Sequence, residues 1–209
     1  MDWTCVSPTL NQQTTDPDDQ HAKHRNERAI GREGRPLNRV RIGFGGGCHW
    51  CTEAVFQSLR GVGDVQQGFI RSLAPHDTFS EAVIVTFDPE IIPLAVLVDV
   101  HLRTHASTSA HKMRGKYRSA VYGFSDAQRD HVAQLLGQFQ QEFEEPIVTS
   151  SLIFDGFKPS PAQFQDYYRT DANKPFCRTY IDPKLAKIRR EFGTYYDDQD
   201  VMPLPGSDV

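Results

Sequence analysis

Apolar residues alternate with polar ones in several short stretches of the chain, and elsewhere they recur at intervals of three and four. Alternation places every second side chain on one face of a strand, whereas the wider spacing is typical of one face of a helix. On this basis we predict strands over residues 39–44, 65–72, 81–87, 119–124 and 147–154. We predict helices over 50–60, from about 90 to 102, from about 125 to 143, a short one from 160, and over 182–192.

The first six of these elements follow the order β-α-β-β-α-β, which is the split βαβ arrangement of ferredoxin-like domains. We therefore predict the α+β class, with a ferredoxin-like βαββαβ core and additional C-terminal helices. Val55, Leu59 and Val62 have the spacing of the core face of the first helix, which Gly61 and Gly63 should end.

Local composition divides the chain into a body and two ends. Residues 1–38 are rich in Asp, Gln, Thr, Arg, Gly and Pro and have no sustained apolar period, so we predict a disordered extension. Residues 39–195 are expected to form one domain, followed by a flexible tail over 196–209. A length of 209 residues suits a single domain with a substantial core.

Charge and cysteine content narrow the functional classes. The net charge is −4 with both signs mixed along the chain, which does not favour nucleic acid or an anionic membrane as partner. No apolar run approaches the roughly 18 residues that a membrane span needs, and the first residues lack the pattern of a secretory signal. Four cysteines do not form a disulfide scaffold in a chain of this length. We expect a cytoplasmic protein with chemically active thiols.

The strongest chemical signal is Cys48-His49-Trp50-Cys51, which follows three glycines and precedes Glu53. Cysteines three positions apart share one face of a helix and can reach each other. The partial positive charge of a helix N-terminus favours thiolate over thiol, which makes a cysteine there nucleophilic. This pattern predicts a redox site.

Other interpretations of the paired cysteines fit less well. A structural zinc site needs four ligands, and the chain has no second Cys-x-x-Cys or His-x3-His, so we predict no metal. A thioredoxin-type dithiol shares the placement between strand and helix, but the predicted order of elements differs from that fold. The glycine run lacks the following Gly-Lys-Ser/Thr of a phosphate-binding loop. Glu53 could also be a solvated acid favoured by the helix dipole.

Several segments together resemble the A-type peptide methionine sulfoxide reductases. The stretch from Gly47 to Glu53 resembles that family's Gly-Cys-Phe-Trp-x-x-Glu signature, and residues 115–119 resemble its Gly-Thr-Gln-Tyr-Arg-Ser segment. Similar matches occur at residues 68–69, 85–89 and 175–177, so the resemblance spans roughly residues 40–193. It implies a two-layer α/β roll with a ferredoxin-like centre.

The resemblance also implies roles for four residues. Cys48 would attack the sulfoxide sulfur, Glu53 would donate the proton, Trp50 would form an apolar wall, and Tyr117 would hydrogen-bond the oxygen or the acid. Positions five apart do not share a helix face, so the first two can meet only if Cys48 precedes the helix. The implied substrate is methionine S-sulfoxide, peptide-bound or free. The implied enzyme is a monomer without bound cofactor that thioredoxin reduces.

Three substrate-binding candidates depart from the family pattern. His49 replaces an aromatic residue, Phe69 replaces a tyrosine, and Lys112 stands where the family has an aspartate. We favour a divergent but active reductase because Cys48, Glu53 and Tyr117 remain. Two alternatives stay open: a redox-sensing, sulfoxide-binding module with weak activity, and a general dithiol-disulfide oxidoreductase.

Two thiols could resolve the sulfenic acid that the reaction would leave on Cys48. Cys51 is close along the helix, whereas Cys177 lies in a segment that resembles the resolving segment of the family. A bridge to Cys177 would require a mobile tail to bring the two Cα atoms within about 7 Å. We weigh the two nearly equally, with Cys177 slightly favoured. Cys5 is expected to have no role in the chemistry.

Overall fold

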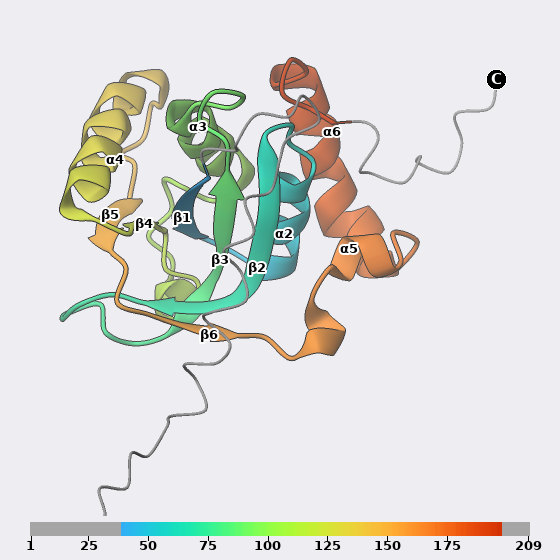
Figure 1. Cartoon of the computed structure of the whole chain (residues 1–209), viewed down its shortest axis with the longest axis horizontal. Coiled ribbons are helices and arrows are strands. Elements are labelled where there is room, and N and C mark those ends of the chain that lie inside the picture. The colour runs from blue at the N-terminus through green and yellow to red at the C-terminus, as the bar shows by residue number, and fades with distance from the viewer. Residues whose placement is uncertain (1–38, 198–209) are drawn as a thin grey trace, which may run out of the picture. The chain divides into compact units, whose positions relative to one another are not determined.

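The computed structural model describes residues 39–197, which form a six-stranded sheet with helices packed against it (Figure 1). The sheet order is β5-β4-β1-β3-β2-β6. Only β5 and β4 pair in parallel; the other neighbouring strands pair antiparallel. The predicted α+β class is confirmed, while the predicted extension over 1–38 and most of the predicted tail lie outside the described residues. The strands are β1 (Val40–Gly45), β2 (Val62–Arg71), β3 (Ser80–Phe87), β4 (Ala120–Gly123), β5 (Ser150–Ile153) and β6 (Gly156–Pro159).

The alternating pattern of the central strands sorts their side chains between the two faces of the sheet. In the pairing of β1 with β3, Ile42 lies opposite Val85, and both belong to the main core with the helices. Ala82 and Ile84 point to the other face, where they join a smaller apolar cluster. Both central strands are therefore buried on two sides, which fixes their register.

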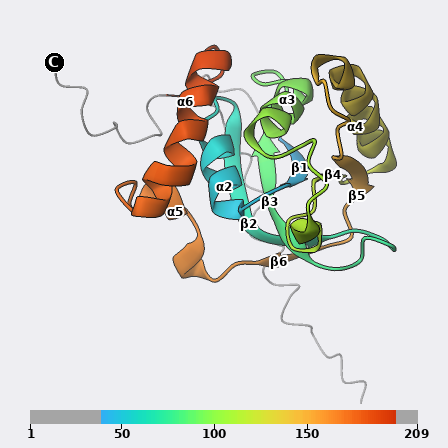
Figure 2. The ribbon, with the colours of Figure 1, turned by 180° about the vertical axis from the view of Figure 1, so that it is seen from behind.

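Five α-helices are described, and Figure 2 shows α2 and α3 in front of the sheet, with α6 beside α2 and α4 beside α3. The ring of Phe56 in α2 stacks on that of Phe44 in β1, with ring centroids 4.4 Å apart. This contact anchors the helix that follows the cysteine motif to the middle of the sheet. The helices are α2 (His49–Gln57), α3 (Leu94–Thr104), α4 (Asp126–Phe139), α5 (Tyr167–Thr170) and α6 (Asp182–Glu191).

The end of α2 differs from the prediction. The helix stops at Gln57 instead of near residue 60, and Val62 starts β2 instead of continuing the apolar helix face. Gly61 causes this turn, because its φ of +86° is a conformation that side-chain-bearing residues rarely adopt. The predicted start of α4 is confirmed, since Ser125 Oγ accepts a hydrogen bond from the N–H of Gln128 at 3.2 Å.

The C-terminal third departs most from the predicted elements. The predicted strand over 147–154 is limited to β5, and β6, which was not predicted, pairs with β2 at the sheet edge. A 3₁₀ turn at Ala162–Phe164 and the single-turn α5 replace the short helix predicted from residue 160. A π-helical turn at Cys177–Ile181 leads into α6, which confirms the helix predicted over 182–192.

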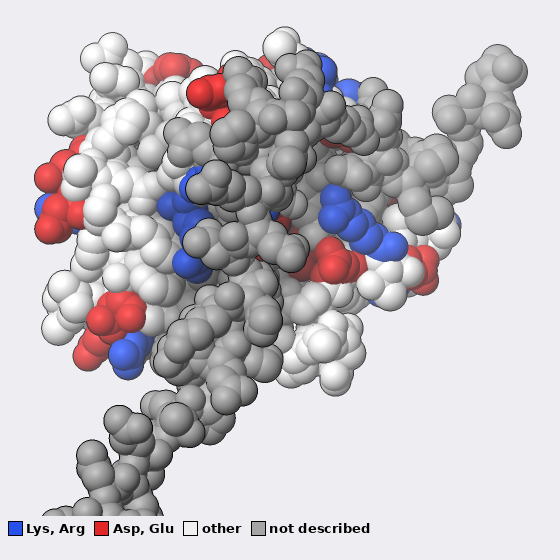
Figure 3. Space-filling view, viewed as in Figure 1, with Lys and Arg blue, Asp and Glu red and all other residues white. Residues whose placement is uncertain are grey.

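Acidic and basic side chains lie next to one another at several places on the face shown in Figure 3, as the mixed charges of the sequence suggest. Within residues 39–197, none of the helices combines the length and the apolar character that crossing a membrane would require.

Candidate active site

Cys48 lies directly before α2 and caps its N-terminus. Its backbone is extended, with φ −60° and ψ 124°, and its carbonyl accepts the N–H groups of Cys51 and Thr52 at 3.1 and 3.2 Å. The chain reaches this position through Gly46, where an added Cβ would approach the ring of His105 to 2.4 Å. The half-buried Cys48 is thus on the incoming segment and not inside the helix, as the sequence argument required.

The surroundings of Cys48 favour its thiolate. The pKa of Cys48 is lowered, first by a hydrogen bond from the Cys51 side chain and then by the backbone N–H groups of Trp50 and Cys51. Burial and the negative charge of Glu81 oppose this effect but do not reverse it. Cys48 is therefore the activated thiol of the pair.

Cys51 has the opposite character. Its side chain is 6% exposed, and its sulfur lies 3.9 Å from the carbonyl oxygen of Tyr180. The hydrogen bond to Cys48 raises the pKa of Cys51, and burial and the charge of Cys48 raise it further. When one of the two thiols loses its proton, Cys48 therefore becomes the thiolate and Cys51 stays protonated.

Cys177 is fully buried in the main core, where its sulfur donates to the carbonyl of Asp171 at 3.6 Å. Burial raises the pKa of this thiol. Cys177 is near enough to Cys51 for its charge to act on that residue. The three cysteines therefore lie in one region, but Cys177 belongs to the packed interior.

Glu53 is only 1% exposed, and both of its carboxylate oxygens are occupied. They accept hydrogen bonds from the backbone N–H groups of Asp166 and Tyr167 at 2.9 and 3.0 Å. Burial raises the pKa of Glu53, although these two bonds lower it. Glu53 thus joins α2 to the start of α5, and within residues 39–197 no hydrogen bond links it to Cys48 or Tyr117. Because its side chain is buried, Glu53 is also not a solvated acid favoured by the helix dipole.

Glu81 at the start of β3 is a buried carboxylate close to Cys48, and it is not among the site residues predicted from the sequence. Its side chain is buried; Oε2 accepts the N–H of His49 at 3.3 Å, and Oε1 lies 3.4 Å from Nζ of Lys116. Its charge acts on Cys48 directly. The available signal was a single acid joined to the apolar run Ala82-Val83-Ile84-Val85, because a charge in a buried strand needs a reason.

Tyr117 is half-buried and approaches the same carboxylate through Lys116. The Lys116 ammonium lies 4.9 Å from the centroid of the Tyr117 ring and also pairs with Glu81. Tyr117 raises the pKa of Lys116, and Glu81 raises it further. Lys116 is therefore a neighbour that Tyr117 and Glu81 share.

Aromatic side chains pack together at the start of α2, next to Cys48. The Trp50 ring stacks on Tyr167 with centroids 4.1 Å apart and an interplanar angle of 5°, and the edge of Phe176 packs against it at 5.5 Å. His49 and Phe69 meet edge to face at 5.4 Å. Trp50, His49 and Phe69 are thus brought together around the start of α2.

His49 and Lys112 differ in their relation to this site. The His49 imidazole is held by the carbonyl of Gly68, 3.0 Å from Nδ1, and is 3.8 Å from Glu81. Lys112 is exposed on a 3₁₀ turn, Lys112–Gly115, and within the described residues it has no hydrogen bond or ion pair with Cys48 or Glu81. The role of Lys112 in substrate binding stays a prediction.

A cavity of about 290 Å³ opens next to Cys48 and Cys51. It lies between the start of α2, the end of α3 and the segment that leads into α6. Most of its surface is apolar, and one lysine lines it. The lining residues are Gly47, Cys48, Cys51, Thr52, Val55, Thr104, His105, Phe176, Tyr180 and Lys184.

Residues 40–196 match the family model described as peptide methionine sulfoxide reductase. Among curated relatives, peptide methionine sulfoxide reductase MsrA of Deinococcus radiodurans is 35% identical over 72% of this chain and 81% of its own length. The protein of the same name from Thermus thermophilus is 34% identical over 70% of this chain and 92% of its own length.

Solved structures show a similar fold. Reduced Mxr1 from Saccharomyces cerevisiae has a TM-score of 0.59 and 22% identity, covering 68% of this chain and 91% of its own. Methionine sulfoxide reductase A of Corynebacterium diphtheriae has a TM-score of 0.57 and 21% identity, covering 66% and 77%.

Proposed function

We propose that this chain, which belongs to the peptide methionine sulfoxide reductase family and is similar to its MsrA members, reduces methionine S-sulfoxide to methionine. The observation that carries the proposal is the pair formed by Cys48 and Glu81. One is a thiol whose pKa is lowered at the start of a helix, and the other is a buried carboxyl group that holds the N–H of the next residue, His49. A nucleophile and an adjacent acid are what sulfoxide reduction requires.

In the first step, Cys48 attacks the sulfur of the sulfoxide. A bond forms between the two sulfur atoms, and the sulfoxide oxygen takes up a proton. The oxygen is then transferred to the Cys48 sulfur, while its bond to the substrate sulfur and the bond between the two sulfur atoms both break. The overall change converts thiol and sulfoxide into sulfenic acid and methionine. The two electrons that reduce the sulfoxide come from the Cys48 sulfur, which is oxidised from thiol to sulfenic acid, so this step needs no bound cofactor.

We assign the proton donor to Glu81 instead of Glu53. Glu81 accepts the N–H of the residue next to the nucleophile, and its carboxylate is joined to Tyr117 through Lys116. Glu53 is held by two backbone N–H groups of another segment, which supports a role in fixing α2. Tyr117 then assists Glu81 by binding the sulfoxide oxygen.

Trp50 and Tyr167 supply an apolar wall for the methyl group on the sulfur of the substrate. His49 and Phe69 border the same site. The anchored imidazole of His49 offers less apolar surface than the phenylalanine of the family signature. We propose that this difference narrows the range of sulfoxides accepted and does not abolish activity.

We propose that Cys51 resolves the sulfenic acid and that thioredoxin then reduces the disulfide. The thiol of Cys51 is already hydrogen-bonded to Cys48, so bond formation needs little movement. Cys177 would have to leave the core first, because it is fully buried. The role of Cys177 as a resolving thiol stays a prediction, with Cys51 now favoured.

The test is turnover of a peptide that contains either epimer of methionine sulfoxide, first with dithiothreitol and then with thioredoxin as reductant. We expect the S epimer to be reduced with both reductants, and the Cys48→Ser variant to be inactive. Reduction of neither epimer by a folded protein would contradict the proposal. The same peptides and free methionine sulfoxide then show which substrate is preferred.

A general dithiol-disulfide oxidoreductase is the second candidate, because one thiol of the Cys-x-x-Cys pair is activated and the other is not. Such an enzyme reduces insulin disulfides and ignores methionine sulfoxide, so one assay separates the two. A sulfoxide-binding module would bind the peptide without releasing methionine.

We further propose that the enzyme acts as a monomer in the cytoplasm, where a reducing environment keeps its thiols active. We also propose that the segment from β1 to β4, with the order β1-α2-β2-β3-α3-β4, forms the ferredoxin-like centre of a two-layer α/β roll. Support comes from its four strands, which lie in the order β4-β1-β3-β2 with antiparallel pairs.

A further inference from the structure

The thiol of Cys51 cannot attack while it is protonated, and its surroundings in the resting enzyme oppose ionisation. Three of these effects involve Cys48 or burial: the hydrogen bond to Cys48, the loss of solvent, and the charge of Cys48. Cys177 and the carbonyl of Tyr180, both close by, also disfavour a negative sulfur. Resolution therefore needs a change in these surroundings or a compensating positive charge.

Formation of the sulfenic acid removes two of these effects at once. Cys48 loses its negative charge and no longer holds the Cys51 proton in a hydrogen bond to a thiolate. Burial remains, because the Cys51 side chain belongs to the main core. What then decides the ionisation of Cys51 is the charge that borders the cavity.

Lys184 of α6 is the cation at this position. It lines the same cavity as Cys48 and Cys51 and lowers the pKa of Cys51 through its charge. Of the two thiols, Cys51 interacts more strongly with Lys184. The other basic group on the cavity wall, His105, is neutral at physiological pH, because burial lowers its pKa to about 4.

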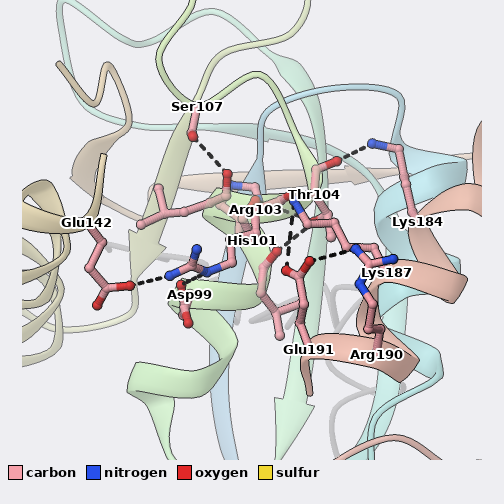
Figure 4. A network of polar contacts seen from close by, with 12 residues as sticks. Asp99, His101, Arg103, Thr104, Ser107, Glu142, Lys184, Lys187, Arg190 and Glu191 are labelled. Carbon is pink, nitrogen blue, oxygen red and sulfur yellow. Dashed lines mark hydrogen bonds and ion pairs between the residues drawn. The ribbon is translucent and has the colours of Figure 1, made fainter. Parts of the chain in front are cut away.

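Figure 4 shows how the Lys184 side chain is held. Lys184 and Lys187 reach from α6 to the end of α3, where Nζ of Lys184 donates to the carbonyl of Thr104 and Nζ of Lys187 donates to that of Arg103 at 2.9 Å. The two lysines thus have the same structural task, which is to satisfy the last carbonyls of a helix. They differ in surroundings: Lys184 borders the thiol cavity, whereas Lys187 pairs with Glu191 at 3.9 Å.

We propose that the Lys184 ammonium stabilises the thiolate of Cys51 during resolution, after Cys48 has become a sulfenic acid. The inference rests on the proposed function, and on Cys51 as the resolving thiol. In this step the Cys51 sulfur bonds to that of Cys48, the S–O bond of the sulfenic acid breaks, and hydroxide leaves and takes up a proton. Lys184 acts through Cys51 and is therefore a positioning residue.

The charges around this pair come from three elements. Cys48 and Cys177 act on Cys51 from the start of α2 and from the π-helical turn, and Lys187 acts on Lys184 along α6. Burial lowers the pKa of Lys184, whereas Cys51 and Cys48 raise it. Lys184→Arg keeps a positive charge at every pH of interest, so it separates the effect of charge from the effect of side-chain length.

The test follows single turnover in the absence of reductant. Reduced full-length protein is mixed with one equivalent of a peptide containing methionine S-sulfoxide. At intervals, methionine formation and the Cys48–Cys51 crosslink are measured separately, the latter by mass mapping after alkylation. The rates are compared from mildly acidic to alkaline pH for the natural protein and for Lys184→Met, Lys184→Arg and Lys187→Met.

Loss of the charge shifts the pH profile of crosslinking in Lys184→Met to higher pH by about one unit, as expected for one nearby charge. At pH values below the new midpoint, the fraction of Cys51 present as thiolate falls about tenfold. The nucleophilicity of the Cys51 thiolate rises about threefold, because it increases with the pKa of the thiol. Together these two effects slow crosslinking about threefold near neutral pH. At alkaline pH the variant becomes about threefold faster for the same reason. Methionine formation changes less than crosslinking, Lys184→Arg restores the natural profile, and Lys187→Met shifts the profile much less than Lys184→Met does.

If Lys184 only stabilised the fold, the crosslinking rates of Lys184→Met and of the natural protein would not cross as the pH rises. Equal profiles for Lys184→Met and the natural protein would overturn the inference while leaving the proposed function intact, and so would the same shift in Lys187→Met. Methionine formation without a Cys48–Cys51 crosslink in the natural protein would overturn both the inference and the role of Cys51. Absence of methionine formation would overturn the proposed function itself.

Discussion

The backbone N–H of His49 donates a hydrogen bond to Oε2 of Glu81 at 3.3 Å, although the two residues are 32 positions apart in the sequence. The bond ties the first residue of α2 to the start of β3. Because His49 directly follows Cys48, the same contact brings a carboxylate close to the Cys48 thiol. The activated thiol and its candidate acid are thus positioned by the packing of the first helix on the sheet.

The first prediction concerns which carboxylate donates the proton. Glu81→Gln keeps the size of the side chain but removes its ionisable proton. General acid catalysis contributes about 10²–10⁴-fold, so we expect kcat/KM for a methionine S-sulfoxide peptide to fall by that order. Glu53→Gln is the matched variant and should lose much less. A larger loss in Glu53→Gln than in Glu81→Gln, with both proteins folded, would return the role to Glu53.

The second prediction concerns stability and pH. Burial raises the pKa of Glu53 above its ordinary 4.5, so the folded state binds that proton more tightly than the unfolded chain. The stabilisation from this proton is fully present below the unfolded pKa and is lost as the pH rises through the folded pKa. From about pH 4.5 upward, the natural protein should therefore lose stability relative to Glu53→Gln.

Urea unfolding at a series of pH values measures this difference. Glu144→Gln is the control, because Glu144 is exposed. The plot of unfolding free energy against pH should be parallel for Glu144→Gln and the natural protein over the whole pH range. Parallel curves for Glu53→Gln as well would mean that Glu53 has the same pKa in the folded and unfolded states.

The third prediction concerns the glycines before Cys48. A Cβ on Gly46 would lie 2.4 Å from the His105 ring, which is itself fixed by the carbonyl of His101 and the hydroxyl of Ser119 at 2.6 and 2.7 Å. Gly46→Ala should therefore cost about 1–3 kcal/mol of unfolding free energy through overpacking. Nothing lies within 4 Å of a Cβ on Gly47, so Gly47→Ala should have little effect on stability. Equal stabilities in thermal or urea unfolding would show that the His105 ring moves aside freely.

The sequence predicts the central part of the fold because apolar periodicity is strong there. β1, α2, β3 and α3 each bury one or two faces, and burial is what produces the alternating or helical pattern. The segment from β6 to Cys177–Ile181 lacks such a pattern, since it includes an edge strand, a 3₁₀ turn and a π-helical turn. Such elements depend on contacts with the rest of the molecule, which a local pattern does not contain.

The sequence predicts Cys48 as the nucleophile from a local motif, whereas the acid that we propose, Glu81, belongs to no such motif. Cys48 stands in a local motif whose chemistry follows from glycines and a helix start. Glu53 has the right spacing within that motif, yet its oxygens are bound by Asp166 and Tyr167, which lie 113 and 114 positions away. Glu81 reaches the site only through strand pairing. Because Glu81 comes from another strand, its proposed role leaves no trace in the spacing of the Cys48 motif.

The last prediction concerns the thiol that resolves Cys48. Cys51 is hydrogen-bonded to Cys48 and one helical turn away, whereas Cys177 is fully buried and donates to the carbonyl of Asp171. After one equivalent of sulfoxide without reductant, mass mapping should therefore find a Cys48–Cys51 crosslink. All of Cys48, Cys51 and Cys177 are free in the resting protein, so any crosslink among them reports on the reaction.

Serine variants separate the chemical step from the resolving step. Cys51→Ser and Cys177→Ser should each form one methionine per protein, because neither thiol attacks the substrate, and Cys48→Ser should form none. Cys51→Ser should accumulate a sulfenic acid on Cys48 that dimedone traps, while Cys177→Ser should form the same crosslink as the natural protein. A Cys48–Cys177 crosslink in the natural protein would instead require the π-helical turn at Cys177–Ile181 to open during catalysis. Cys51 would then serve to activate Cys48 through its hydrogen bond and would have no part in resolution.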